Sequence, residues 1–70
     1  MKEILMDVSE LEAPYPLYEI LKKLNRLNKD EILIVKHRLY PQGLLPHLAT
    51  FNHHIIRHNQ NHFEIKVWKK

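Results

Sequence analysis

Residues 5–17 read LMDVSELEAPYPL, a segment in which a strand passes through an acidic loop into a helix opened by two prolines. The alternation of apolar positions just before and within this segment has a period of two, which predicts a strand over residues 3–8. Pro14 and Pro16 suit the first turn of a helix, because a missing N–H costs nothing there. The segment therefore predicts a strand that leads directly into a helix.

The rest of the chain predicts one more helix and three more strands. Residues 31–37 contain a continuous apolar run, which indicates a central strand buried on both faces. Residues 44–51 predict a short second helix, and residues 53–58 and 62–68 predict a hairpin closed by the polar loop 59–61. The first helix has an apolar stripe at spacings of three and four, made by Leu17, Ile20, Leu21, Leu24 and Leu27.

These elements follow the order βαβαββ in a single domain over residues 1–70. A right-handed crossover makes the first two strands parallel and puts both helices on one face of the sheet. We therefore expect an α+β fold, a two-layer sandwich with a mixed four-stranded sheet. Seventy residues lie near the lower limit at which a hydrophobic core alone stabilises a domain.

Composition excludes several classes of protein. The chain has no cysteine, so it forms no disulfide and no thiolate zinc site. Its longest apolar run is too short to cross a bilayer and its N-terminus lacks the apolar region of a signal peptide, so we expect a cytoplasmic protein without membrane contact. The net charge of +3 comes from scattered lysines and arginines, a distribution that makes nucleic acid an unlikely partner.

Several short motifs occur in a fixed order along almost the whole chain. They are Asp-Val-Ser-Glu-Leu at 7–11, Ala-Pro-Tyr-Pro at 13–16, His37 after the second strand, Pro41, and Leu-Leu at 44–45. Together they resemble the TusA/SirA sulfur-carrier superfamily, and most closely its uncharacterised cysteine-less branch, which in bacteria often occurs beside or fused to haemerythrin-like domains. The resemblance implies a similar two-layer sandwich, but that branch has no settled activity and a fold alone does not imply one.

Ala13 separates this chain from the sulfur carriers. In that superfamily the residue before the proline pair is a cysteine that carries sulfur as a persulfide. A methyl group neither ionises nor holds sulfane sulfur, and the chain has no other thiol. The resemblance therefore implies a non-catalytic interaction or ligand-binding module in a bacterial redox or sulfur-related context, and we expect neither enzyme activity nor a cofactor.

The loops after the first two strands form the first candidate site, because the carboxyl ends of parallel strands meet at one edge of a sheet. Two following helices would direct unpaired N–H groups there, which favours a small anion, a cofactor edge or a partner loop. Alternatively, His37 and Arg38 pair with the loop glutamates and only neutralise them. The candidate residues are Glu10, Glu12, Ala13, Pro14, Tyr15 and Pro16 from one loop, and His37, Arg38 and Tyr40 from the other.

The hairpin offers a second candidate site. His54, His58 and His62 would share one face if His58 and His62 were directly opposed, and Glu64 follows nearby. Such a group suits zinc, nickel or copper. The alternative is a solvated, polar turn with no ligand, and it is the more common use of such residues.

Two further surfaces are candidates for partners. Lysines and arginines on the first helix and the strands, with Trp68 nearby, are compatible with RNA binding, although the interleaved acids favour a solvated face. Leu5, Ile56 and Trp68 would join the apolar run of residues 32–35 on the open face of the sheet. That patch predicts a protein partner or a homo-oligomer through the open sheet face.

Overall fold

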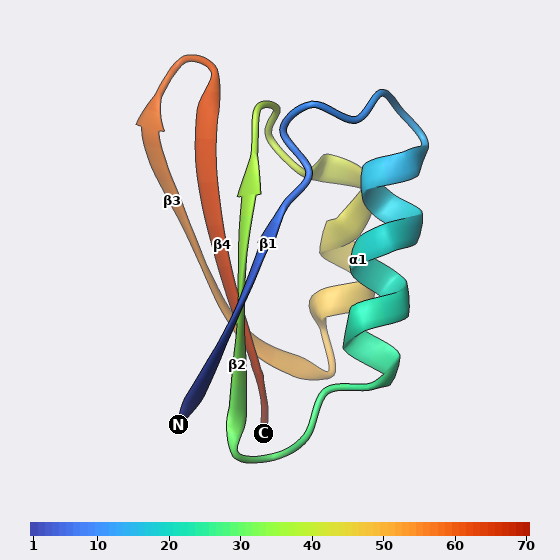
Figure 1. The fold of residues 1–70 in the computed structure, drawn as a ribbon, viewed down its shortest axis with the longest axis vertical. Helices are drawn as coiled ribbons and strands as arrows, with labels where there is room; N and C mark the ends of the chain where they lie inside the picture. Colours follow the sequence, from blue (N-terminus) through green and yellow to red (C-terminus); the bar gives the residue numbers. More distant parts are fainter.

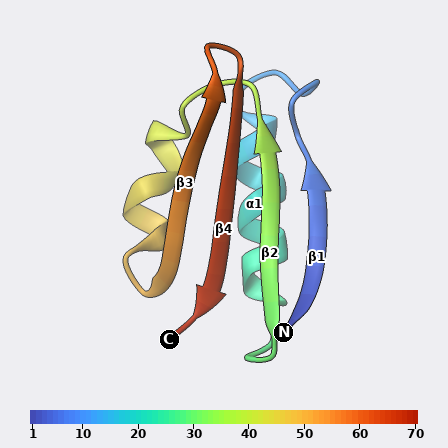
Figure 2. The same cartoon turned by 90° about the vertical axis from the view of Figure 1, so that its left-hand side faces the viewer.

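The sheet is built around β2 (Glu31–His37), which lies between β1 (Lys2–Asp7) and β4 (His62–Lys69) in a computed structural model that describes residues 1–70. β3 (Phe51–Asn59) forms the other edge, so the strand order is β1-β2-β4-β3 (Figure 2). β1 runs parallel to β2, whereas β4 is antiparallel to both of its neighbours. The sheet is therefore mixed, as the sequence predicts.

Both helices cover the same face of this sheet (Figure 1). α1 (Tyr15–Asn25) packs against β2, and η1 (Gln42–Leu48), a 3-10 helix, packs against β3 (Figure 2). The predicted α+β two-layer sandwich with the order βαβαββ is confirmed. Neither helix has the length and apolar character needed to span a membrane.

The second helix differs from its predicted form. It was expected over residues 44–51, but it ends at Leu48, and Phe51 is already the first residue of β3. Pro46 lies inside it and cannot donate a backbone hydrogen bond, and the amide of Leu44 donates to the carbonyl of Pro41 at 3.0 Å, the i to i−3 spacing of a 3-10 turn. The proline thus favours a short, tight helix and leaves more residues for the strand.

The hairpin is also longer than predicted. Asn59 pairs with His62, so only Gln60 and Asn61 remain in the loop instead of the predicted three residues. The register shifts between Arg57 and Asn59, which marks a bulge at this end of β3.

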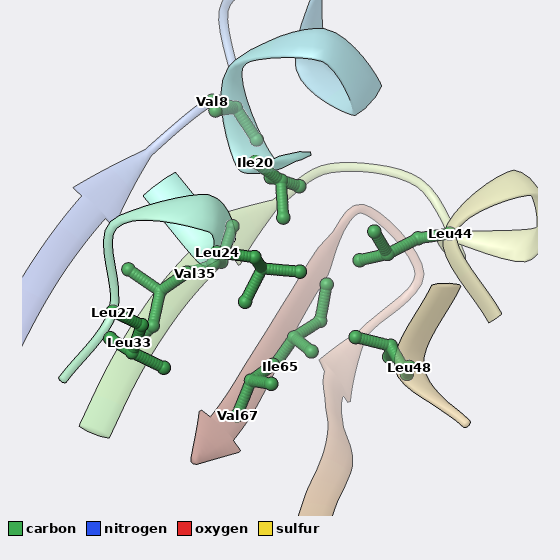
Figure 3. Packing of buried hydrophobic residues seen from close by; sticks show 10 residues of the cluster. All are labelled: Val8, Ile20, Leu24, Leu27, Leu33, Val35, Leu44, Leu48, Ile65 and Val67. Carbon is green, nitrogen blue, oxygen red and sulfur yellow. The ribbon is translucent and has the colours of Figure 1, made fainter. Parts of the chain in front are cut away.

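The core lies between the sheet and the two helices (Figure 3). Leu33 and Val35 of β2 pair with Val67 and Ile65 of β4, and because directly paired residues share a face, all four point toward the helices. All four are fully buried. Around them pack the other members of the core, Val8, Ile20, Leu24, Leu27, Leu44 and Leu48.

The open face of the sheet carries a smaller apolar patch than the sequence predicts. Leu5 pairs with Ile34, and Ile32 pairs with Trp68, so these four side chains are neighbours. Ile34 is buried even on this face, which confirms that β2 is buried on both sides. Ile56 pairs with Glu64 and lies outside the patch.

Self-association through this patch remains a prediction. We expect sedimentation across a concentration series to show a dimer that dissociates on dilution. Replacement of Leu5 by glutamate should abolish it, because Leu5 is the most exposed member of the patch and a charge there would be desolvated in the interface. A sedimentation coefficient that stays monomeric at every concentration would contradict it. Leu33 belongs to the same apolar run of residues 32–35 but faces the core, so its replacement would report on folding instead.

Candidate functional site

A cavity of about 300 Å³ opens at the edge of the sheet where β1 and β2 end. One wall comes from the loop after β1 and the first turns of α1, and the other comes from the loop after β2 and the start of η1. These segments lie together at the top of Figure 1. The lining is mostly apolar and consists of Leu11, Ala13, Pro14, Pro16, Leu17, Ile20, His37, Leu39, Tyr40, Pro41, Gln42, Gly43 and Leu44.

Backbone hydrogen bonds hold the first wall in place. The amide of Val8 donates to the carbonyl of Lys36 at 2.9 Å, which continues the β1–β2 pairing one residue past the strand. The amide of Leu11 then donates to the carbonyl of Val8 at 3.1 Å and turns the chain toward α1. The Ala13–Pro14 peptide bond that follows is cis.

Short turns shape the second wall. The amide of Gln42 donates to the carbonyl of Tyr40 at 2.8 Å, and Pro41 between them is buried. The ring of Tyr40 meets the ring of Phe63 edge to face, with 5.9 Å between the centroids and 77° between the planes. This contact with the core side of β4 holds Tyr40 at the opening of the cavity.

His37 is the buried polar residue of the cavity lining, whereas Tyr40 and Gln42 are exposed. Its side chain is only 9% exposed, and its Nδ1 atom accepts a hydrogen bond from the amide of Leu39 at 3.1 Å. The bond assigns the proton of the neutral ring to Nε2. The structure leaves no buried side-chain nitrogen or oxygen without a partner, so Nε2, which bonds no protein group, is accessible to solvent, and His37 is one of the residues that line the cavity. It is a hydrogen-bond donor available to a ligand.

Burial lowers the pKa of His37 below its usual value, and the positive charge of the adjacent Arg38 lowers it further. The imidazole is therefore neutral at pH 7. It donates a hydrogen bond at the cavity without contributing a positive charge.

The start of α1 offers fewer free donors than the sequence implies. Pro14 and Pro16 have no N–H, and the amide of Tyr15 already donates to the carbonyl of Glu12 at 3.0 Å. The expectation of several unpaired amides at this edge therefore needs correction. The prolines that open the helix also remove the donors that would have bound an anion.

Five of the nine predicted residues line the cavity, namely Ala13, Pro14, Pro16, His37 and Tyr40. Glu10, Glu12, Tyr15 and Arg38 lie beside the lining residues, are exposed and do not line it. The three ion pairs of the structure all lie elsewhere, so Arg38 and His37 do not neutralise the two glutamates.

Several apolar residues of the lining, above all Leu11 and Leu39, are not among the residues that the sequence predicts for the site. Both are large and apolar, yet each lies between charged or polar neighbours outside any helix or strand. The only sequence feature that could have indicated them is an isolated leucine in each loop. Such a leucine indicates a cavity wall only when the two loops are known to face each other.

The hairpin histidines come together only in part. Nε2 of His58 lies 3.2 Å from Oε1 of Glu64, and the rings of His58 and His62 meet edge to face with centroids 5.0 Å apart. His54 is paired instead with Lys66, farther along the strands. The chain contains no group of three or more histidine or carboxylate side chains placed to hold a metal ion.

The basic residues are interleaved with acids, as the sequence indicates. Lys22 pairs with Glu19 at 3.6 Å on α1, and Lys66 pairs with Glu64 at 3.8 Å on the open face. The surface is thus mixed in charge at the places proposed for RNA.

No family model, curated protein or solved structure matches this chain.

Proposed function

We propose that the protein is a non-catalytic binding module whose cavity holds a small, uncharged and largely apolar group with one hydrogen-bond acceptor. The observation that carries this proposal is the orientation of His37. Its Nδ1 atom is occupied by the amide of Leu39, so its Nε2–H is left as a donor in an otherwise mostly apolar lining. A few fixed polar groups in an apolar pocket are the usual arrangement of a ligand site.

The lining favours a neutral group over an anion. It includes no lysine or arginine, and His37 is kept neutral by burial and by Arg38. An anion would lose its hydration in such a cavity without gaining a counter-charge. A neutral group therefore fits the cavity better than the small anion that the sequence predicts as a ligand.

Ala13 supports a binding role rather than a chemical one. It lines the cavity at the position where the sulfur carriers have their cysteine, so its methyl group adds apolar surface where a thiol would react. The βαβαββ order and this position support our proposal that the chain is a TusA/SirA-like protein without the carrier cysteine. That kinship makes a bacterial cytoplasm the expected setting.

Titration with acetophenone and with benzoate tests the proposal. The two probes share a benzene ring and an acceptor, but only benzoate is charged. We expect acetophenone to shift the amide resonances of Leu17, Leu39 and Gly43 saturably in heteronuclear NMR spectra, with a dissociation constant that is roughly millimolar, as for other fragments. Benzoate should shift them less at equal concentration.

Two filling variants and one control make the test specific. Ala13→Leu puts a large side chain into the wall, and Gly43→Leu does the same from the other side, where a Cβ would lie 4.0 Å from Leu17 and φ is not positive. Both should weaken acetophenone binding by about ten-fold or more, roughly 1.4 kcal/mol. Ala49→Leu, at an exposed alanine outside the cavity, should leave it unchanged. The proposal would be contradicted if benzoate bound more tightly than acetophenone. It would also be contradicted if acetophenone caused the same shifts in Ala13→Leu and Gly43→Leu as in the wild type.

A further inference from the structure

We infer that the group held by the cavity is the apolar side chain of a peptide segment from another protein, with a lysine or arginine one or two residues away. This inference rests on the proposed binding cavity and names its partner. Three features of the described residues carry it: the exposed apolar rim, the size of the cavity with the His37 donor in its wall, and the charge beside it.

The rim of the cavity is apolar and open to solvent. Leu11 is 38% exposed, Leu39 is 55% exposed and Tyr40 is 52% exposed, although each also lines the cavity. A small molecule inside the cavity would leave most of this rim in water. A peptide that inserts one side chain and runs across the opening would cover it, and exposed apolar surface around a pocket is typical of protein interaction sites.

The cavity suits a side chain better than a cofactor. Its volume of about 300 Å³ lies at the lower end of the usual range for small-molecule sites, roughly 300–1,000 Å³. A leucine, methionine or phenylalanine side chain is a group of the appropriate size. We call the inserted apolar side chain of the peptide the anchor. The Nε2–H of His37 can then donate to a main-chain carbonyl of the peptide beside the anchor, an acceptor that every peptide offers.

The negative charge beside the cavity favours a basic residue next to the anchor in the peptide. Glu10 and Glu12 flank the lining residue Leu11, are exposed, and take part in none of the ion pairs of the structure. They make this loop locally acidic on a chain whose net charge is +3. A lysine or arginine in the partner would complement them, which affects partner choice and the rate of association.

Selection from a phage-displayed library of random peptides tests the inference, with the full chain as bait. We expect enriched sequences to share a large apolar residue with a lysine or arginine within two positions. Synthetic peptides of the enriched sequence, measured by fluorescence anisotropy, should bind about ten-fold or more weakly to Ala13→Leu. Affinity should fall with increasing salt, since exposed charges are screened.

A double substitution tests the role of the acidic loop. Glu10→Gln with Glu12→Gln should reduce the affinity and remove the preference for the basic residue, while an anchor-only peptide should bind the variant as it binds the wild type. The matched control is Glu3→Gln with Asp30→Asn, which removes two exposed acids at the opposite end of the sheet. It should leave peptide binding unchanged.

The outcomes separate the inference from the proposed function. If acetophenone binds and is blocked by Ala13→Leu, but no selected peptide competes with it, the cavity takes small molecules and the peptide inference fails. Selected peptides that lack a basic preference, or that bind equally to the Gln double variant, also overturn it. If neither probe nor peptide depends on Ala13→Leu, the proposed function fails as well.

Discussion

Replacing Leu33 by alanine is expected to lower the free energy of unfolding by about 2–5 kcal/mol, the range for deleting a buried leucine side chain. Leu33 is 0% exposed and belongs to the core on the helix-facing side of β2. A single core in a domain of this length rarely supplies more than roughly 3–5 kcal/mol. The variant should therefore be largely unfolded at 25 °C, which circular dichroism with urea titration would show.

Leu5→Ala is the matched control for this loss. It makes the same change of side chain in the neighbouring strand, but Leu5 is 71% exposed on the other face of the sheet. Its urea midpoint should stay close to that of the wild type, measured at a concentration where the protein is monomeric. Equal destabilisation by the two substitutions would mean that Leu5 also faces the core, as it would if the register of β1 alone were wrong by one residue, because such a slip turns the side chains of that strand to the other face.

Mild acid is expected to destabilise the protein through His37. The pKa of His37 is lowered in the folded state by burial and by Arg38, whereas in the unfolded chain it returns to about 6.5. The unfolded state then binds more protons, so stability is fully present above about pH 6.5. It falls as the pH drops through the range between the unfolded and folded pKa values, by at most about 1.4 kcal/mol per pH unit for this one proton.

Urea titrations between pH 7.5 and pH 5 would measure this effect. His37→Gln removes the titrating ring and should flatten this part of the pH dependence, even if it lowers stability at every pH. Arg38→Gln removes the second cause, so the pKa of His37 should rise toward its usual value and the loss of stability in acid should become smaller. A wild-type slope that persists unchanged in His37→Gln would show that other groups cause the acid sensitivity.

The arrangement of the sheet could largely be predicted from the sequence, because burial leaves a clear periodic signal. The apolar run at residues 32–35 predicts a central strand, and β2 is the strand with neighbours on both sides and buried residues on both faces. The apolar stripe predicts the inner side of α1, and Ile20 and Leu24 lie in the core. Each of these patterns reflects one requirement, the removal of apolar surface from water.

The turns and the second helix were less predictable because they depend on single residues and on register. Pro46 favours a 3-10 helix over an α-helix, but the leucines around it fit either form. The bulge near His58 moves the hairpin register, and periodicity alone gives no sign of it. The loop predicted from the sequence, residues 59–61, was therefore one residue too long.

The candidate site could be located but not characterised from the sequence. Parallel strands bring their carboxyl ends together, and this rule is sufficient to place Pro14, His37 and Tyr40 near one another. The polarity of the site was not accessible in this way. It depends on the hydrogen bond from Leu39 to His37 and on the two loop leucines that line the cavity, and both follow from how the loops pack.

The strand order has a consequence for folding during synthesis on the ribosome. β4 is the last strand to be synthesised, yet it lies in the interior of the sheet between β2 and β3. Until it emerges, β2 can pair only with β1, and β3 has no neighbouring strand at all. The edges of β2 and β3 that β4 later pairs are therefore exposed until β4 has emerged, so the sheet is completed only after the last of its four strands has been synthesised.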